Sequence, residues 1–257
     1  GNAETWEEHD QSKMAKIIPE DRRMGFPVRE IIETLADKNS FLELKKIFGR
    51  SVVTGFIRIE GKPYALIAND CQQLGGAVDS EASDKVANFL EICSQHNLPI
   101  ISLVDTPGFM VGPESETEGA FRRMGNFFKR GAKVNSKFVA IILRRGYGLG
   151  AMAMTGGSFL DPIYTASWPN GEFGGMGLEG YVKLGFKKEL EAEETEEKKK
   201  ALYDKLLAKM YEVGRATEAA SYLEMDAVID PVDTREVIIK AFENFGAVSY
   251  THLRAHE

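Results

Sequence analysis

The sequence has 257 residues, of which 43% are hydrophobic and 28% are charged, and its formal net charge is −7. This length is enough for one large domain with a substantial buried core. The negative charge and the lack of a sustained basic run argue against nucleic-acid binding, and no run approaches the roughly 18 apolar residues of a membrane span. The two cysteines are too few for a disulfide framework, so a reducing compartment is favoured.

The N-terminal part predicts an extended lead-in followed by a helix and a hairpin. Residues 5–25 are polar and mixed, without a periodic apolar pattern. Pro27 is suited to open a short helix, because proline in the first turn costs no hydrogen bond. Two β-branched and aromatic runs, 52–59 and 64–68, then flank a Glu-Gly turn at 60–61, which is typical of a β-hairpin.

The middle of the chain alternates between helical and strand patterns. Apolar residues at helical spacing predict a helix that follows Asp79 or Ser80 as its N-cap, with Cys93 on the apolar stripe. Two apolar runs, 99–104 and 138–143, predict buried strands with a second helix between them. This order indicates parallel strands with crossover helices. The loop expected at 105–109 would then lie at a strand's carboxyl end, where open α/β sheets place ligands.

The C-terminal part predicts mainly helices. We expect a flexible loop at 171–177, one long helix over 187–213, and a last helix from Asp233 to Phe245. The periodicity then stops, which predicts an unrelated or disordered tail over 246–257. No internal repeat or long linker is present. The sequence is therefore interpreted as an α/β protein with a single domain over 26–245, after a lead-in over 1–25.

A glycine-rich turn, Gly148-Leu149-Gly150-Ala151, follows the second buried strand, where a helix is expected to begin near Ala151. Backbone N–H groups at the start of a helix have no intrahelical partner, and the helix dipole is positive there. Glycine lets a ligand approach the backbone closely. The turn therefore suits an oxygen that becomes negative during a reaction. A structural turn or a phosphate cradle would show the same spacing, and both alternatives stay open.

Other kinds of active site lack their motifs. The sequence Asp-Thr-Pro-Gly at 105–108 is like a GTPase switch, but no P-loop motif is present. There is no G-x-S-x-G, and Ser158 has no histidine partner that can be named. C-x-x-C and H-E-x-x-H are also absent, so no metal is expected. These absences favour catalysis by backbone dipoles, with the base supplied by the substrate or a cofactor.

Six short segments together resemble one family, the carboxyltransferase β subunits of biotin-dependent acyl-CoA carboxylases of the propionyl-CoA and acetyl-CoA type. In chain order they read VTGF, LGGAVD, VDTPGF, LRRGYG, ASWP and MGLEG, at 53–56, 74–79, 104–109, 143–148, 166–169 and 176–180. The resemblance is to the C-terminal domain of these subunits and runs from about Ile17 to Phe245. It implies a crotonase-like fold, in which ββα units form a spiral of sheets flanked by helices.

The resemblance also implies a reaction: carboxyl transfer from carboxybiotin to the α-carbon of an acyl-CoA. Biotin would arrive on a lysine of a separate carrier protein. The acyl-CoA would lie mainly on an N-terminal carboxyltransferase domain, which this sequence does not contain. The active site would form at a dimer interface within a homo-oligomer such as a hexamer. The implied location is the cytoplasm, or the mitochondrial matrix in a eukaryote.

The family motif at the turn ends in Gly-Gly-Ala, and its last two residues match Gly150 and Ala151. The resemblance assigns their N–H groups to the oxygen that becomes negative on biotin. One extra residue in the motif leaves the register open by one position. Ala153 stands where the family faces the acyl group. The other residues expected around biotin and substrate are Gly148, Leu149, Gly75, Gly76, Pro107, Gly108, Phe109, Gly174 and Gly175.

Three alternatives stay open. A crotonase-type hydratase or isomerase would need two glutamates near the glycine turn, and Glu172 and Glu179 are the candidates. A biotin-dependent acyl-CoA decarboxylase would share every motif named above. Finally, a chain with only one half of the site could be a non-catalytic assembly module.

Overall fold

The computed structural model describes residues 5–110, 118–158, 161–174, 182–183, 185–221 and 225–253. Its centre is an eight-stranded sheet with the order β1-β2-β3-β4-β5-β6-β8, in which β7 also pairs with β5. The strands are β1 (Leu42–Leu44), β2 (Val52–Ile59), β3 (Lys62–Asn69), β4 (Ile100–Thr106), β5 (Phe138–Tyr147), β6 (Tyr164–Ser167), β7 (Glu172–Gly174) and β8 (Ala227–Val228).

The sheet begins with the expected hairpin and continues with parallel strands. β2 and β3 are antiparallel, and both turn residues, Glu60 and Gly61, have the positive φ that a tight two-residue hairpin turn requires. β3, β4, β5, β6 and β8 then run parallel. Parallel neighbours need crossover connections, and α3 (Ser80–Gln95) and α4 (Glu118–Gly131) provide the first two. The hairpin and both crossover helices are confirmed.

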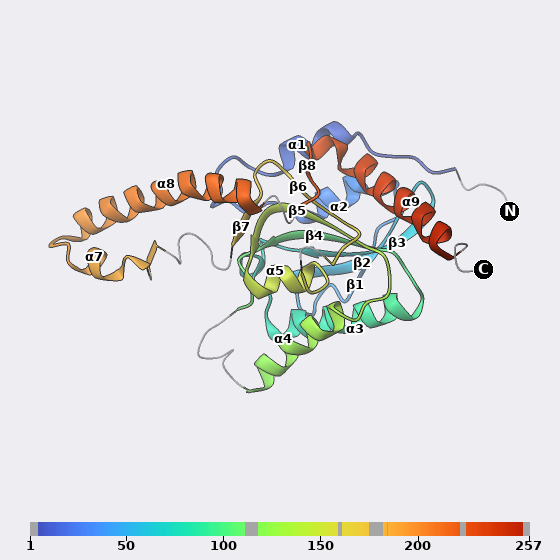
Figure 1. The fold of residues 1–257 in the computed structure, drawn as a ribbon, viewed down its shortest axis with the longest axis horizontal. Helices are drawn as coiled ribbons and strands as arrows, with labels where there is room; N and C mark the ends of the chain where they lie inside the picture. The colour runs from blue at the N-terminus through green and yellow to red at the C-terminus, as the bar shows by residue number, and fades with distance from the viewer. Residues whose placement is uncertain are drawn as a thin grey trace.

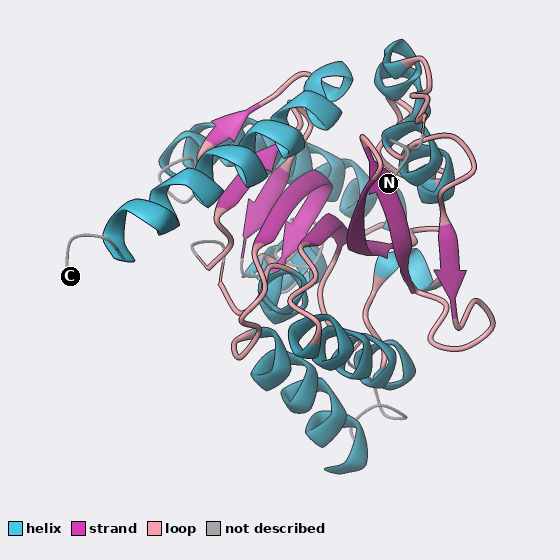
Figure 2. Cartoon of the chain, turned by 90° about the vertical axis from the view of Figure 1, so that its right-hand side faces the viewer, coloured by secondary structure: helices cyan, strands magenta, loops and turns pink. Residues whose placement is uncertain are grey.

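Helices cover both faces of the sheet (Figures 1 and 2). One face packs against α1 (Met14–Ile17), α2 (Val28–Leu35) and α9 (Thr234–Leu253), and the other against α3, α4 and α5 (Gly148–Met154). Alternate residues of β4 serve the two cores, because Ile101 and Leu103 lie on the α2 side while Ile100 and Val104 lie on the α3 side. This double burial explains why β4 and β5 appear in the sequence as continuous apolar runs.

Two expectations about the helical parts are wrong. The lead-in is not simply extended, since it forms a 3-10 turn (Gln11–Lys13) and α1, and Met14 of α1 is fully buried. The long helix expected over 187–213 is divided into α7 (Lys187–Glu191) and α8 (Glu196–Ser221). Thr195 accepts a hydrogen bond from the Lys198 backbone N–H at 3.2 Å, as an N-cap residue does, so a new helix starts there. Both helices project to one side of the sheet (Figure 1).

The last helix is longer than its apolar pattern. A 3-10 turn (Pro231–Asp233) precedes α9, which starts at Thr234 and continues to Leu253. The part of the expected tail before 254 is therefore helical. A single glycine at 246 costs about 1 kcal/mol in a helix, which is too little to end a helix that is already formed. The domain limits expected at 26 and 245 remain a prediction.

Candidate functional site

Three of the motif segments meet at the carboxyl ends of β3, β4 and β5. The loop after β3 is joined to the loop after β4, because the Val78 N–H donates to the Gly108 carbonyl at 3.0 Å and the Met110 N–H donates to the Val78 carbonyl at 2.9 Å. The turn after β5 packs against the same loop: a Cβ added to Gly150 would lie 2.6 Å from the carbonyl carbon of Gly108. This close approach explains the glycine at 150.

The expected Gly75-Gly76 pair lies beside this junction in a 3-10 turn (Leu74–Gly76). Both glycines have a left-handed backbone, with φ of +62° and +83°. A Cβ on Gly76 would lie 2.4 Å from the Asp105 carbonyl oxygen, and the Gly75 carbonyl accepts a hydrogen bond from Arg145 Nη2 at 2.7 Å. The structure therefore brings together the expected residues Gly75, Gly76, Pro107, Gly108, Phe109, Gly148, Leu149 and Gly150.

The helix after the turn starts earlier than expected. β5 continues through Tyr147, and α5 begins at Gly148, whose φ is +64°, rather than near Ala151. An α-helical N–H bonds to the carbonyl four residues back, so Gly148, Leu149 and Gly150 have no acceptor within the helix. Ala151 is the first residue whose N–H can bond to the N-cap carbonyl, that of Tyr147.

Exposure divides the turn into an open part and a buried part. The Leu149 side chain is 60% exposed, whereas Ala151 and Ala153 are fully buried. Ala153, which was expected to face the acyl group, lies in the apolar core on the α3 side of the sheet. Gly150 is buried as well, so an approaching ligand would meet the backbone around Gly148 and Leu149 first.

Within the flexible loop expected over 171–177, residues 172–174 form β7, which pairs in parallel with residues 145–147 of β5. Gly174 lies opposite Tyr147 in this pairing, while Gly175 lies outside the described residues. Glu172 is 5% exposed, accepts a hydrogen bond from the Tyr147 hydroxyl at 2.8 Å and forms an ion pair with Arg22. Its carboxylate is thus already engaged, and its expected partner Glu179 also lies outside the described residues.

A pocket of about 230 Å³ opens beside these loops. Its lining residues are Arg22, Arg23, Gly25, Cys71, Gly75, Pro107, Arg144, Arg145, Tyr147 and Glu172. Of these, Gly75 and Pro107 were expected around biotin and substrate, and Glu172 was a candidate for the hydratase or isomerase alternative. The missed signal is the Arg144-Arg145 pair, two charged residues that directly follow an apolar strand. Charged residues are rarely buried unless they are paired, so a buried partner could have been sought for them.

The partner of both arginines is Asp105, at the end of β4. Arg144 Nη2 and Arg145 Nε each lie 2.9 Å from an Asp105 carboxylate oxygen, and the Asp105 side chain is fully buried. Burial alone would raise the pKa of Asp105, but the hydrogen bonds and charges of Arg145 and Arg144 outweigh burial and hold that pKa below its ordinary value. Asp105 is therefore an ionised anchor beside the pocket and is unsuited to act as a general base.

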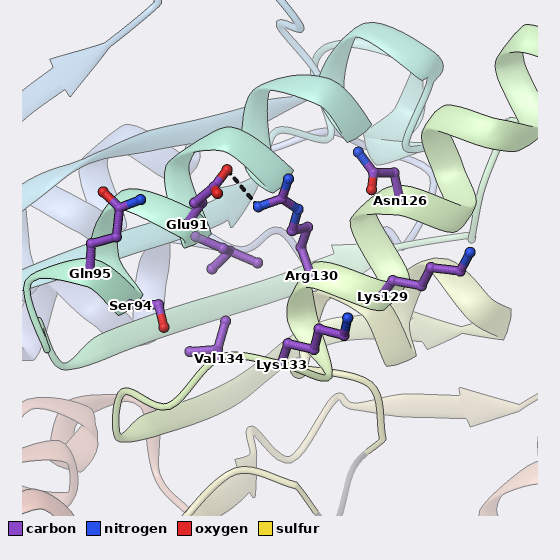
Figure 3. A pocket seen from close by; sticks show the side chains of 9 residues that line it. Glu91, Ser94, Gln95, Asn126, Lys129, Arg130, Lys133 and Val134 are labelled. Atoms are coloured by element: carbon purple, nitrogen blue, oxygen red, sulfur yellow. Dashed lines mark ion pairs between the residues drawn. The ribbon is translucent and has the colours of Figure 1, made fainter.

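A second hollow, of about 480 Å³, lies between α3 and α4, away from the expected residues (Figure 3). Its lining includes Lys129, Lys133 and an ion pair of 2.5 Å between Arg130 and Glu91. None of the residues expected at the site lines it. The site is therefore placed at the strand ends and not in this groove.

Within the described part of the chain, no group of three or more His, Cys, Asp or Glu side chains is arranged to hold a metal ion. None of the helices there combines the length and the apolar character of a membrane span.

Comparison with known proteins gives one consistent result. The family model described as the carboxyl transferase domain matches residues 1–248. The methylmalonyl-CoA carboxyltransferase 12S subunit of Propionibacterium freudenreichii is 31% identical over 241 residues, which is 93% of this chain and 45% of the relative. The propionyl-CoA carboxylase beta chain of Saccharopolyspora erythraea is 32% identical over 233 residues, covering 88% of this chain and 41% of that protein. The chain thus spans less than half the length of these curated relatives.

Solved structures agree. A single-chain, multi-domain long-chain acyl-CoA carboxylase matches with a TM-score of 0.85 and 46% identity, over 92% of this chain and 24% of that protein. The transcarboxylase 12S structure, a hexamer with methylmalonyl-CoA bound, matches with a TM-score of 0.80 and 29% identity. The match covers 93% of this chain and 45% of that protein. The expected crotonase-like α/β fold is confirmed by these matches. The chain therefore belongs to the carboxyl transferase domain family.

Proposed function

We propose that this chain supplies the biotin-side half of an active site that transfers a carboxyl group from carboxybiotin to the α-carbon of an acyl-CoA, of the propionyl-CoA or acetyl-CoA class. The observation that carries the proposal is the meeting of motif segments 74–79, 104–109 and 143–148 around the Gly148–Ala151 turn. Family membership supports the reaction class.

The turn fits a ligand oxygen that gains negative charge. It offers backbone N–H groups without helical acceptors, and the Gly150–Gly108 packing holds them in place before any charge develops. When bound, carboxybiotin would supply both the carboxyl group and the base. Each N–H donor of this kind contributes about 3 kcal/mol to stabilising a transition state.

We assign one donor to Gly150 and the second to its neighbour in the same turn. The resemblance to the family motif implies Gly150 and Ala151, with the register open by one residue. The start of α5 at Gly148 favours Leu149 as the neighbour, because Ala151 has a helical acceptor position and Leu149 does not. In this proposal Gly148, Gly75, Gly76 and Pro107 to Phe109 shape the pocket around biotin, with Gly174 at its β7 side and Ala153 beneath the turn. Gly175 is proposed to contribute as well, although it lies outside the described residues.

The proposed partners follow from the family's two-part active site, since this chain spans less than half the length of its curated relatives. They are an N-terminal carboxyltransferase domain that holds the acyl-CoA, a carrier protein that bears biotin on a lysine, and further copies of the chain in a dimer-based oligomer. No metal in this chain, no nucleic acid and no membrane enter the scheme. The proposed location is the cytoplasm, or the mitochondrial matrix in a eukaryote.

The test is biotin-dependent carboxyl exchange. The chain is mixed with carboxylated carrier and with acetyl-CoA or propionyl-CoA, with and without an N-terminal carboxyltransferase half. We expect transfer of labelled carboxyl to the acyl-CoA only when both halves are present. Absence of transfer from the completed site would overturn the proposal, while loss of the carboxyl group as CO₂ without transfer would favour the decarboxylase, and equal activity without this chain would favour an assembly module.

A further inference from the structure

We propose that Asp105 is a positioning residue for the Gly148–Ala151 turn, and that it acts by fixing Arg144 and Arg145 at the end of β5. The inference rests on the proposed function for its catalytic consequence, although its structural consequence can be measured separately.

The Asp105 carboxylate is bound from two sides. Arg144 donates from Nε at 3.2 Å and from Nη2 at 2.9 Å. Arg145 donates from Nε at 2.9 Å, from Nη2 at 3.0 Å and from its backbone N–H at 3.0 Å. Both guanidinium groups therefore use two nitrogens, which fixes their orientation as well as their distance. One carboxylate orders two adjacent arginines.

Adjacent residues of a regular strand point to opposite faces, so this arrangement needs an irregular strand. Val104 pairs with Ile142, and Thr106 pairs with Gly146. Three residues of β5, Leu143 to Arg145, thus lie opposite the single residue Asp105. Such a bulge bends a strand and re-aims its side chains. Here it lets consecutive arginines reach the same carboxylate.

The clamp, by which we mean Asp105, Arg144 and Arg145, joins segments that are distant in the sequence. Arg145 Nη2 donates to the Gly75 carbonyl at 2.7 Å. Arg144 Nη1 donates to the carbonyls of Arg22 at 3.2 Å and Met24 at 2.8 Å. The lead-in, the loop after β3 and the ends of β4 and β5 are thereby tied to one carboxylate.

The donor turn lies immediately after this anchor. Arg145 is three residues before Gly148, and Gly146 between them is paired with Thr106. Gly108, three residues after Asp105, is the residue that Gly150 packs against. The segment after Asp105 and the segment after Arg145 therefore come into contact again at Gly108 and Gly150. A change at Asp105 should move both sides of the Gly108–Gly150 contact.

Asp105 is the residue of the clamp whose substitution should disturb the structure most, because it is the single carboxylate that pairs with both arginines. Asp105 is fully buried, Arg144 is 4% exposed and Arg145 is 23% exposed. An asparagine at 105 would keep the size of the side chain, but it would remove the negative charge and replace one acceptor with a donor. Both guanidinium groups would then lose a charged partner in a poorly hydrated place.

The experiment compares Asp105→Asn with a matched control, Asp37→Asn. Asp37 is also a buried carboxylate that accepts from two backbone N–H groups, of Glu60 at 3.0 Å and Gly61 at 2.7 Å, and from one arginine, Arg235, at 2.6 Å. It lies at the β2–β3 turn, at the opposite end of β3 from the site. Arg145→Lys is the conservative variant, because it keeps the charge and loses the two-nitrogen contact.

Two readouts are taken on the full chain completed with an N-terminal carboxyltransferase half. We expect Asp105→Asn to lower kcat for carboxyl exchange about 10- to 100-fold with little change in the KM for acyl-CoA, Arg145→Lys to lower it less, and Asp37→Asn to leave it near the wild-type value. Amide hydrogen exchange over 145–151 should quicken at least about 10-fold in Asp105→Asn relative to Asp37→Asn.

Equal kcat for Asp105→Asn and Asp37→Asn at equal thermal stability would overturn the inference, as would unchanged amide exchange over 145–151. If the wild-type protein shows no carboxyl exchange, the proposed function fails while the amide-exchange comparison still decides whether Asp105 holds the turn. Should Asp105→Asn fail to fold, Arg145→Lys against Asp37→Asn gives the same comparison.

Discussion

Lys85 shows how one residue can carry a pH dependence that has no part in the proposed chemistry. It lies on α3 and is 1% exposed, and its ammonium donates to the Val52 carbonyl at 2.7 Å. Burial lowers the pKa of Lys85 from 10.5 to about 8, against the attraction of nearby Glu43. Two neutral carbonyls, those of Val52 and of Gly49 at 3.4 Å, are its hydrogen-bond acceptors.

This lysine should make the free energy of unfolding rise with pH. Between about pH 8 and 10.5 the unfolded chain holds the Lys85 proton while the folded chain has lost it, so the folded state gains relative stability. We expect Lys85→Met to lack this rise. Each pKa unit corresponds to about 1.4 kcal/mol. Between about pH 8 and 10.5 the free energy of unfolding of the wild type should therefore rise by on the order of 1–3 kcal/mol more than that of Lys85→Met. Urea unfolding at both pH values measures the difference. Parallel curves would show that Lys85 has an ordinary pKa.

At the scale of residues, the sequence could indicate which glycines matter at the site, but it could not indicate which charged residues form ion pairs there. The glycines at 75, 76 and 150 could be selected, since glycine marks close approach and left-handed backbone. Asp105 was assigned to a loop, although it lies on β4. The reason is that its two arginines neutralise a charge that would otherwise prevent burial, and no local pattern reports an ion pair between residues 40 positions apart.

At the scale of elements, the loop after β3 meets the end of β4 through two glycines in different surroundings. Gly75 and Gly76 share a left-handed backbone, with φ of +62° and +83°. A Cβ at Gly75 would meet nothing within 4 Å, whereas one at Gly76 would lie 2.4 Å from the Asp105 carbonyl oxygen. Substitution of Gly75 therefore tests backbone strain alone, whereas substitution of Gly76 tests backbone strain together with overpacking.

We expect Gly75→Ala to lower the free energy of unfolding by about 1–2 kcal/mol, which is the usual cost of a left-handed alanine. Gly76→Ala carries the same strain plus overpacking of about 1–3 kcal/mol, so it should lose about 2–5 kcal/mol. Chemical unfolding of both variants gives the comparison. Equal losses would mean that β4 and the loop do not approach each other as described.

The elements themselves were largely predictable, and their ends were not. The hairpin, α3 and the central parts of β4 and β5 followed from apolar periodicity. β5 was expected to stop at 143 but runs to Tyr147, because its last residues are held by Asp105 and by pairing with β7. β7 itself was assigned to a loop, since its three residues are too few to show alternation. Tertiary contacts, rather than local preference, decide these ends.

At the scale of the whole molecule, the two ends of the chain close one face of the sheet. Trp168 Nε1 donates to Thr234 Oγ1 at 2.9 Å at the start of α9, and Phe242 packs on Tyr64 with ring centroids 5.1 Å apart. Met14 of α1 is fully buried in the same core. The sequence indicated the apolar stripe of α9 but gave no sign that the lead-in contributes to the core, because Met14 stands in a polar stretch.

The expected domain limits can be tested from this packing. The α9 side chains that the structure describes in the core, such as Ile238 and Phe242, come before Phe245. If the folded unit ends near 245, as expected from the sequence, deletion of 246–257 should change the free energy of unfolding by less than about 1 kcal/mol. Met14→Ala should cost about 2–5 kcal/mol, as is usual for a buried methionine. Urea unfolding measures both. A large loss on deletion, or none for Met14→Ala, would move the limits of the folded unit.

The central claim, that the Gly148–Ala151 turn supplies N–H donors for carboxyl transfer, is tested most directly at Leu149. Its side chain is 60% exposed, and proline is tolerated in a first helical turn while it removes the N–H. In biotin-dependent carboxyl exchange by the completed site, Leu149→Pro should lower kcat about 100- to 1,000-fold, whereas the control Leu149→Ala, which keeps the N–H, should stay within about threefold of the wild type. A folded Leu149→Pro variant with the activity of Leu149→Ala would contradict the account.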